Sequence, residues 1–100
     1  MRKEFGQIEG NVQLTDQLAL YGMCVGDIVV ESGGVLHLYG MSAGNIEVKV
    51  GGSLCLYGMC TGSVVNSGGK IEISGMVVGN LEKQAGSTTV LPTARVGVEP

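Results

Sequence analysis

The chain has 100 residues, a formal net charge of −3 and 44% apolar residues. This length allows one domain, and with one Phe and no Trp the core must be aliphatic. Six basic and nine acidic residues, without a basic cluster, disfavour nucleic-acid binding. No apolar run approaches the roughly 20 residues that a spanning helix needs, so we expect no membrane span.

Residues 1–9 precede the repeats and mix charged residues with Phe5 and Ile8. We expect this stretch to be an N-terminal segment or cap. It lacks the apolar core of a secretion signal, which favours a cytoplasmic protein. An odd number of cysteines without paired spacing predicts reduced thiols at Cys24, Cys55 and Cys60.

A repeat begins at residue 10. The motif Leu-Tyr-Gly-Met occurs at 20–23, 38–41 and 56–59, and a weaker Ile-Ser-Gly-Met follows at 73–76. Similar residues at a fixed spacing are typical of a solenoid. The units are 10–25, 26–43, 44–61, 62–78 and 79 to about 96, and each opens on Gly followed by Asn, Asp or Ser. We expect this doublet to turn the chain because both residues tolerate positive φ.

Apolar residues alternate with polar ones inside each unit, which predicts strands. In the third unit, Ile46 and Val48 begin the pattern, Leu54 and Leu56 continue it after a Gly-Gly corner, and a short third side follows Gly58. Three corners per unit predict an all-β fold, a single-stranded three-sided parallel β-helix of about five coils of 17–18 residues. The solenoid domain is expected at 10–97 and a tail at 98–100. An antiparallel sandwich would not explain the repeated residue identities.

Inward aliphatic residues of successive coils should stack on one another. We expect Met23, Met41, Met59 and Met76 to fill the core as well. Asn66 and Lys83 replace inward aliphatic residues, so the array should weaken there. The last coil is therefore expected to be a frayed end or a cap.

The Gly doublets, the uninterrupted coils and the stretch Thr89-Val90-Leu91-Pro92-Thr93-Ala94-Arg95-Val96 together resemble the bactofilins, which are polymer-forming bacterial cytoskeletal proteins. The likeness covers roughly residues 8–97. It implies a right-handed β-helix that joins end to end into nonpolar filaments and scaffolds other proteins in the cytoplasm. The Tyr-Gly-Met signature and the short flanks set this chain apart from that family.

Both ends of a β-solenoid expose unpaired strand edges unless a cap covers them. The sequence has no evident capping helix, so we expect a non-enzymatic scaffold protein whose partner is itself, as dimers or filaments. The residues expected at the end-to-end interface are Phe5, Ile8, Val12, Leu14, Val90, Leu91 and Val96.

Tyr21, Tyr39 and Tyr57 occupy one column at the third corner. An exposed aromatic ladder can bind another protein, as a second partner, or a sugar ring. Stacking that only stabilises neighbouring coils explains the same pattern. Both interpretations stay open.

Metal-ligand residue types converge only in the column of Ala19, His37, Cys55 and Glu72. Three ligands in a line do not make the tetrahedral site that zinc prefers. Hexapeptide-repeat acyltransferases share 18-residue triangular coils, but here the single His lies in a coil without an inserted loop. We therefore expect no catalytic residues, no metal and no cofactor.

A second hypothesis is a small acidic inhibitor, similar to immunity proteins or antitoxins, that covers a basic cleft with one flat face. Its candidate contacts are Asp27, Glu31, Glu47 and Glu72. Concentration dependence separates the two hypotheses, because a scaffold assembles alone and an inhibitor waits for its target.

Overall fold

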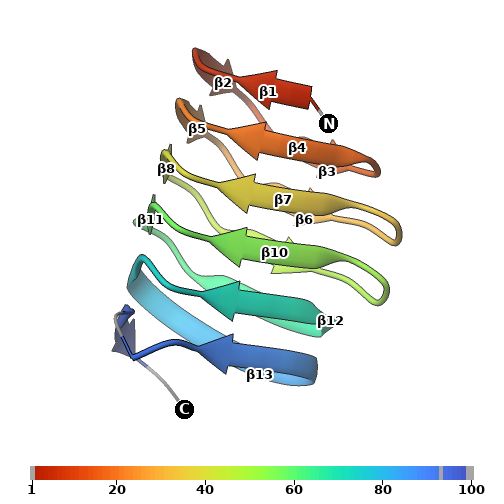
Figure 1. Ribbon diagram of the computed structural model, residues 1–100, viewed down its shortest axis with the longest axis vertical. Coiled ribbons are helices and arrows are strands. Elements are labelled where there is room, and N and C mark those ends of the chain that lie inside the picture. Colours follow the sequence, from red (N-terminus) through yellow and green to blue (C-terminus); the bar gives the residue numbers. More distant parts are fainter. Residues whose placement is uncertain (1, 93, 99–100) are drawn as a thin grey trace.

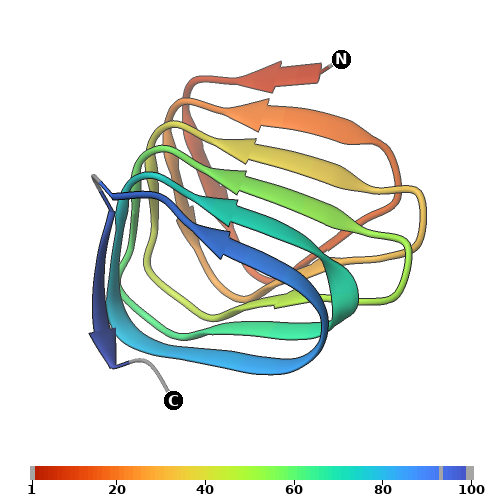
Figure 2. The same ribbon diagram turned by 60° about the horizontal axis from the view of Figure 1, so that its bottom comes forward.

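The computed structural model describes residues 2–92 and 94–98, which form strands and, within those ranges, no helix (Figure 1). Neighbouring strands are parallel in the pairings from β1 to β14. Successive coils are nested around one shared interior (Figure 2), so the prediction of a three-sided parallel β-helix is confirmed. With no helix in the described ranges, none is available there to cross a bilayer.

Each coil contributes a strand to each of three faces, in chain order. The first face contains β3 (Val12–Leu14), β6 (Ile28–Val30), β9 (Ile46–Val48), the start of β12 (Val64–Ile73) and the middle of β13 (Met76–Val90). The second face contains β1 (Arg2–Glu4), β4 (Gln17–Leu20), β7 (Val35–Leu38), β10 (Ser53–Leu56) and the ends of β12 and β13. The third face contains β2 (Gln7–Glu9), β5 (Met23–Val25), β8 (Met41–Ser42), β11 (Met59–Cys60), the start of β13 and β14 (Arg95–Val98).

The 18-residue spacing of the sequence becomes direct stacking in space. Leu38 pairs in register with Leu56, and both side chains are fully buried. The same holds for Ile46, which lies between Ile28 and Val64. Each buried Leu or Ile contributes about 1.5–3 kcal/mol through the hydrophobic effect. The aliphatic columns therefore bury a continuous core through the stack.

Close backbone approach, and not positive φ, fixes most of the corner glycines. A Cβ on Gly40 would clash with the carbonyl oxygen of Gly22, and a Cβ on Gly58 would clash with that of Gly40. Positive φ occurs mainly at the second corner, as at Gly33 (85°) and Gly51 (84°), and also at Gly10 (92°), which opens the first unit. A side chain at either kind of position would force the backbone apart or strain it.

The polar residue after each opening Gly links neighbouring coils by hydrogen bonds. The amide of Asp27 donates to Oδ1 of Asn11 at 3.1 Å, and the amide of Asn45 donates to Oδ1 of Asp27 at 2.9 Å. Ser63 and Asn80 continue this ladder, with distances of 2.9 and 3.2 Å. These polar residues do not adopt positive φ, so the conformational reason that we gave for them is wrong.

Asn66 explains why the fourth coil has one residue fewer. In the longer coils, a backbone hydrogen bond closes the second corner, as from Gly52 N to Lys49 O at 2.9 Å. In the shorter corner, Oδ1 of Asn66 accepts from the amides of Gly68 and Gly69 at 3.1 and 2.8 Å. Its Nδ2 donates to the next coil, to the Ser87 carbonyl and the Thr88 hydroxyl. We expected Asn66 to weaken the array. Instead it is buried and acts as a brace, since its hydrogen bonds hold its own corner and join it to the next coil.

Residues 2–9 continue the stack instead of lying apart from it. β1 pairs with β4 and β2 pairs with β5, both in parallel. The coils therefore begin at residue 2, before the boundary at residue 10 that we expected. Met1 and the tail residues 99–100 lie outside the described residues, while Val98 belongs to β14.

Candidate functional site

The N-terminal end of the solenoid is one turn of exposed strand edge. Among the described residues, β1 pairs with β4 alone, β2 with β5 alone and β3 with β6 alone. Their outward edges therefore carry backbone groups without a strand partner in this chain. Such an edge is a template for another strand.

The C-terminal end has the same property. The part of β13 from Leu81 to Val90 pairs with β12, and β14 pairs with Met76, Val77 and Asn80 of β13. Within the described ranges, neither segment has a strand on its other side. Over residues 2–92 and 94–98, both ends of the rod thus have strand edges whose backbone N–H and C=O groups face no neighbouring strand.

Most of the residues expected at the end-to-end interface lie near these ends. Ile8 and Val12 pack partly buried against the core at the N-terminal end, as do Val90 and Val96 at the C-terminal end. Leu91 is half-buried. Leu14 is fully buried because it points into the column of Val30, so its side chain is not part of the end surface.

Each end has a charged residue at a position in register with an inward column. Glu4 is in register with Leu20 and is half-buried, while Lys83 is in register with Asn66 and is exposed. Inward charges on terminal strands oppose unrestricted strand pairing. In the described part of the chain, the backbone edges at both ends are therefore unpaired, while the charges of Glu4 and Lys83 limit which strands can pair with them.

The aromatic ladder is present and is one ring longer than expected. Ring centroids lie 4.7 Å apart between Tyr21 and Tyr39, and 4.9 Å apart between Tyr39 and Tyr57. Phe5 stacks on Tyr21 at 4.9 Å and is 70% exposed, so this residue belongs to the ladder. The sequence carried this signal, since Phe5 precedes Gly6 as each Tyr precedes its corner Gly.

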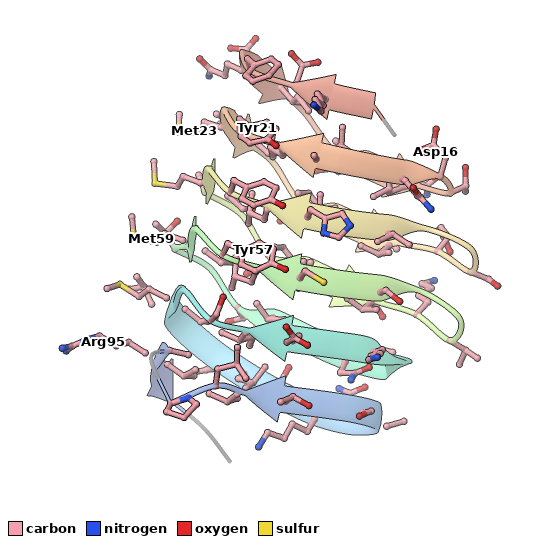
Figure 3. The ribbon with its side chains drawn as sticks, in the orientation of Figure 1. Asp16, Tyr21, Met23, Tyr57, Met59 and Arg95 are labelled. Carbon is pink, nitrogen blue, oxygen red and sulfur yellow. The ribbon has the colours of Figure 1, made fainter. Side chains whose placement is uncertain are left out.

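The methionines do not fill the core. On the short third face, alternation places Cys24, Ser42, Cys60 and Val77 inward, and the preceding methionines therefore point outward. Met23 and Met59 project from the edge of the stack (Figure 3). Met76 is 38% exposed. The prediction that these methionines are core residues is wrong, because successive side chains of a strand point to opposite faces and the residue after each methionine is the one turned inward.

The environment of the inward cysteine column disfavours the reactive thiolate form of Cys24 and Cys60. Burial raises the pKa of the Cys24 and Cys60 thiols. The Cys60 thiol donates to the Gly44 carbonyl at 3.5 Å. Between them, the buried hydroxyl of Ser42 has only the Cys60 thiol as a weak polar neighbour among the described residues. The cysteines are free thiols, and this column is a packing feature.

His37, Cys55 and Glu72 share a column as predicted, in register with Ala19. The His37 ring stacks on Tyr39 at 6.5 Å. Burial, and secondarily the Glu72 carboxylate, raises the pKa of the Cys55 thiol. Within the described part of the chain, no three His, Cys, Asp or Glu side chains are placed to hold a metal ion.

The four carboxylates of the inhibitor hypothesis do not share one face. Glu47 and Glu72 lie on the first and second faces, while Asp27 and Glu31 lie at separate corners. Glu47 accepts from the Ser67 hydroxyl at 2.9 Å, and Asp27 belongs to the corner ladder. Glu31 and Glu47 border a shallow hollow of about 420 Å³, but Lys49 lines it too.

Searches of protein-family models, of curated proteins and of solved structures found no match to this chain.

Proposed function

We propose that this chain is a non-enzymatic structural protein that associates with itself through the ends of its solenoid, as dimers or filaments. The proposal follows from the resemblance to bactofilins. It includes the cytoplasm as the compartment in which the protein acts. In this proposal, the assembled rods present their faces to other proteins as a scaffold.

The observation that carries the proposal is the pair of open ends. Each end offers a full turn of parallel strand edge, and no helix in the described ranges covers either one. Partly buried aliphatic side chains lie beneath these edges, including Val12 at one end and Val96 at the other. Pairing with another copy would satisfy the backbone groups and bury these side chains together.

The inhibitor hypothesis has weaker support. Its four carboxylates are divided between two faces and two corners, and two of them already hold neighbouring coils together. A flat acidic surface matched to a basic cleft would need these charges side by side. Self-association needs only the edges that any uncapped parallel solenoid has.

Sedimentation velocity over a concentration series, together with negative-stain electron microscopy, tests the proposal. The wild-type chain should form species larger than its 10.3 kDa monomer, and these should lengthen with concentration. Val12→Glu and Val96→Glu should reduce the assembly by placing a charge at each end. Circular dichroism should retain the β signal in both variants.

Val50→Glu is the matched control, because Val50 is 70% exposed but lies at the second corner of a central coil. This variant should assemble as the wild type does. Monomers at every concentration would contradict the proposal. Monomers that form a stoichiometric complex with one target would support an inhibitor instead.

A further inference from the structure

The outward surface of the third face is apolar through four successive coils. One of its columns runs from Gln7 through four methionines to Arg95, and a parallel column runs from Glu9 through Val25 to Val78. We name the apolar part the third-face patch, formed by Met23, Val25, Met41, Ala43, Met59, Thr61, Met76 and Val78.

The third-face patch is exposed in the isolated chain. Val25 is 42% exposed, Val78 is 51% exposed and Met76 is 38% exposed. The tyrosine ladder borders one side of it, and the other side is the corner ladder of Asp27, Asn45 and Ser63. An apolar centre rich in Met, with Tyr and polar groups at the rim, is the composition of a protein interface.

On the strands of this face, the described charged side chains lie at the two short ends, and Asp27 lies in the corner ladder along one long side. Glu9 lies beside the patch at the N-terminal end, and Arg95 lies beside it at the C-terminal end. Both side chains are exposed. The surface is therefore acidic at one end, basic at the other and uncharged between them.

We propose that the third-face patch binds the same patch of a second copy, with the two solenoid axes antiparallel. A twofold axis along the strand direction then places Met23 opposite the partner's Met76, and Met41 opposite the partner's Met59. The same operation brings Arg95 opposite the partner's Gln7 and diagonal to the partner's Glu9. Each dimer gains two such contacts between opposite charges.

The parallel arrangement of the same faces is disfavoured by charge. A twofold axis along the solenoid would bring Glu9 near the partner's Glu9, and Arg95 near the partner's Arg95. Like charges at both rims suppress that pairing. The charge pattern therefore selects one orientation of a second copy, which an unspecified partner would not require.

The size of the patch sets the strength of the contact. Four strands at about 4.8 Å spacing make the patch about 14 Å long, and three residues make it about 10 Å wide; the rim strands that carry Glu9 and Arg95 extend the face to about 24 Å. This is smaller than the roughly 800 Å² per partner of a standard stable interface, so single copies pair weakly. If copies also join end to end, as the proposed function holds, neighbouring patches act together and the pairing strengthens.

Cysteine cross-linking tests the antiparallel arrangement. The background is Cys55→Ser, because Cys55 is the half-exposed native thiol. Met23→Cys and Met76→Cys are made separately, and a mixture of the two is treated at high protein concentration with a bifunctional thiol reagent just long enough to bridge backbones roughly 10 Å apart across packed sheets. A cross-linked dimer is expected in the mixture and not with either variant alone.

The chosen positions separate face pairing from end pairing. Met23 and Met76 each lie about one coil from an end, so any end-to-end contact leaves them about 14 Å apart, beyond the reach of that reagent. Adding Val96→Glu should shorten end-to-end assemblies and leave this cross-link unchanged. The two proposals can therefore fail independently.

Sedimentation gives a second measurement without engineered thiols. Met59→Glu places a charge at the centre of the pairing and should weaken dimer formation by about tenfold or more. Val50→Glu, away from the third face, should not change it. No cross-link in the mixture would overturn the proposal, and cross-linking of each variant alone would overturn the antiparallel orientation. A monomeric chain that instead co-sediments with phosphatidylcholine vesicles would assign the patch to lipid.

Discussion

The central coils, residues 26–61, and the last coil, residues 79–98, use the same ladders with different interiors. In the central coils the inward columns of the first two faces hold only aliphatic side chains, such as Val30 and Leu38. In the last coil, Lys83 is exposed at one such column and Thr88 is half-buried at another. Among the described side chains of this coil, only Leu81 remains fully buried.

This difference reflects the number of neighbours. A residue in a central coil is fixed by the coil above and by the coil below, so both its size and its polarity are restricted. A residue in a terminal coil meets one neighbour and can carry a charge at small cost. Residue identities therefore repeat closely in coils that have a neighbouring coil on both sides. They diverge in the terminal coils, whose free side is available to another copy.

The largest effect is expected from the corner glycines. Gly40→Ala should destabilise the fold by about 3 kcal/mol or more, because its Cβ would clash with the Gly22 carbonyl oxygen. Gly6→Ala is the matched control in the same column, where the nearest atom to the added Cβ is a side-chain oxygen of Glu4 at 3.5 Å. Urea unfolding of both variants measures the difference. Equal losses would mean that the coils are not stacked in this register.

The next largest effect is expected at Asn66. Asn66→Val makes its column uniform with Val30 and Val48, yet it should destabilise by about 2–3 kcal/mol because the amides of Gly68 and Gly69 lose their acceptor. Val48→Asn should also destabilise, since the Gly52 amide at that corner already has a backbone partner. Thermal unfolding measures both. Increased stability of Asn66→Val would show that Asn66 is not a brace.

A smaller effect of opposite sign is expected at Ser42. Its hydroxyl is buried between Cys24 and Cys60, and among the described residues it has only the Cys60 thiol as a weak polar neighbour. Ser42→Ala should therefore stabilise the chain by about 1 kcal/mol, since it removes a polar group that loses its hydration on folding. Urea midpoints measure the change, and a loss of stability would mean that the hydroxyl is hydrogen-bonded in solution.

The smallest effects concern the thiols. In the native chain only Cys55 should react with a thiol reagent, slowly at neutral pH and faster as the pH rises, because its pKa is raised above the ordinary value of 9.0. Cys24 and Cys60 should react on unfolding. Because their folded pKa values are raised, the unfolding free energy should hold below pH 9.0 and fall as the pH rises above it. Rapid labelling of all three thiols would contradict this account.

The sequence was sufficient for the class of fold and for the register of the main columns, because identical residues at 18-residue spacing have one simple explanation in space. It was insufficient where two phases of alternation were possible, as at Met23 on the three-residue side. It also missed the role of Asn66, because a side chain that replaces a turn hydrogen bond has no periodic signal. Phe5 was placed at the end but not in the ladder, since the repeat was started one coil too late.

Hydrogen exchange at low and high protein concentration tests the central claim, that the open ends are the associating surfaces. Amides of the central strands β7 and β10 should be protected at both concentrations. Amides of β1, β3 and β14 should exchange quickly in dilute solution and gain protection at high concentration. Terminal amides that exchange alike at both concentrations, in samples where larger species are present, would contradict it.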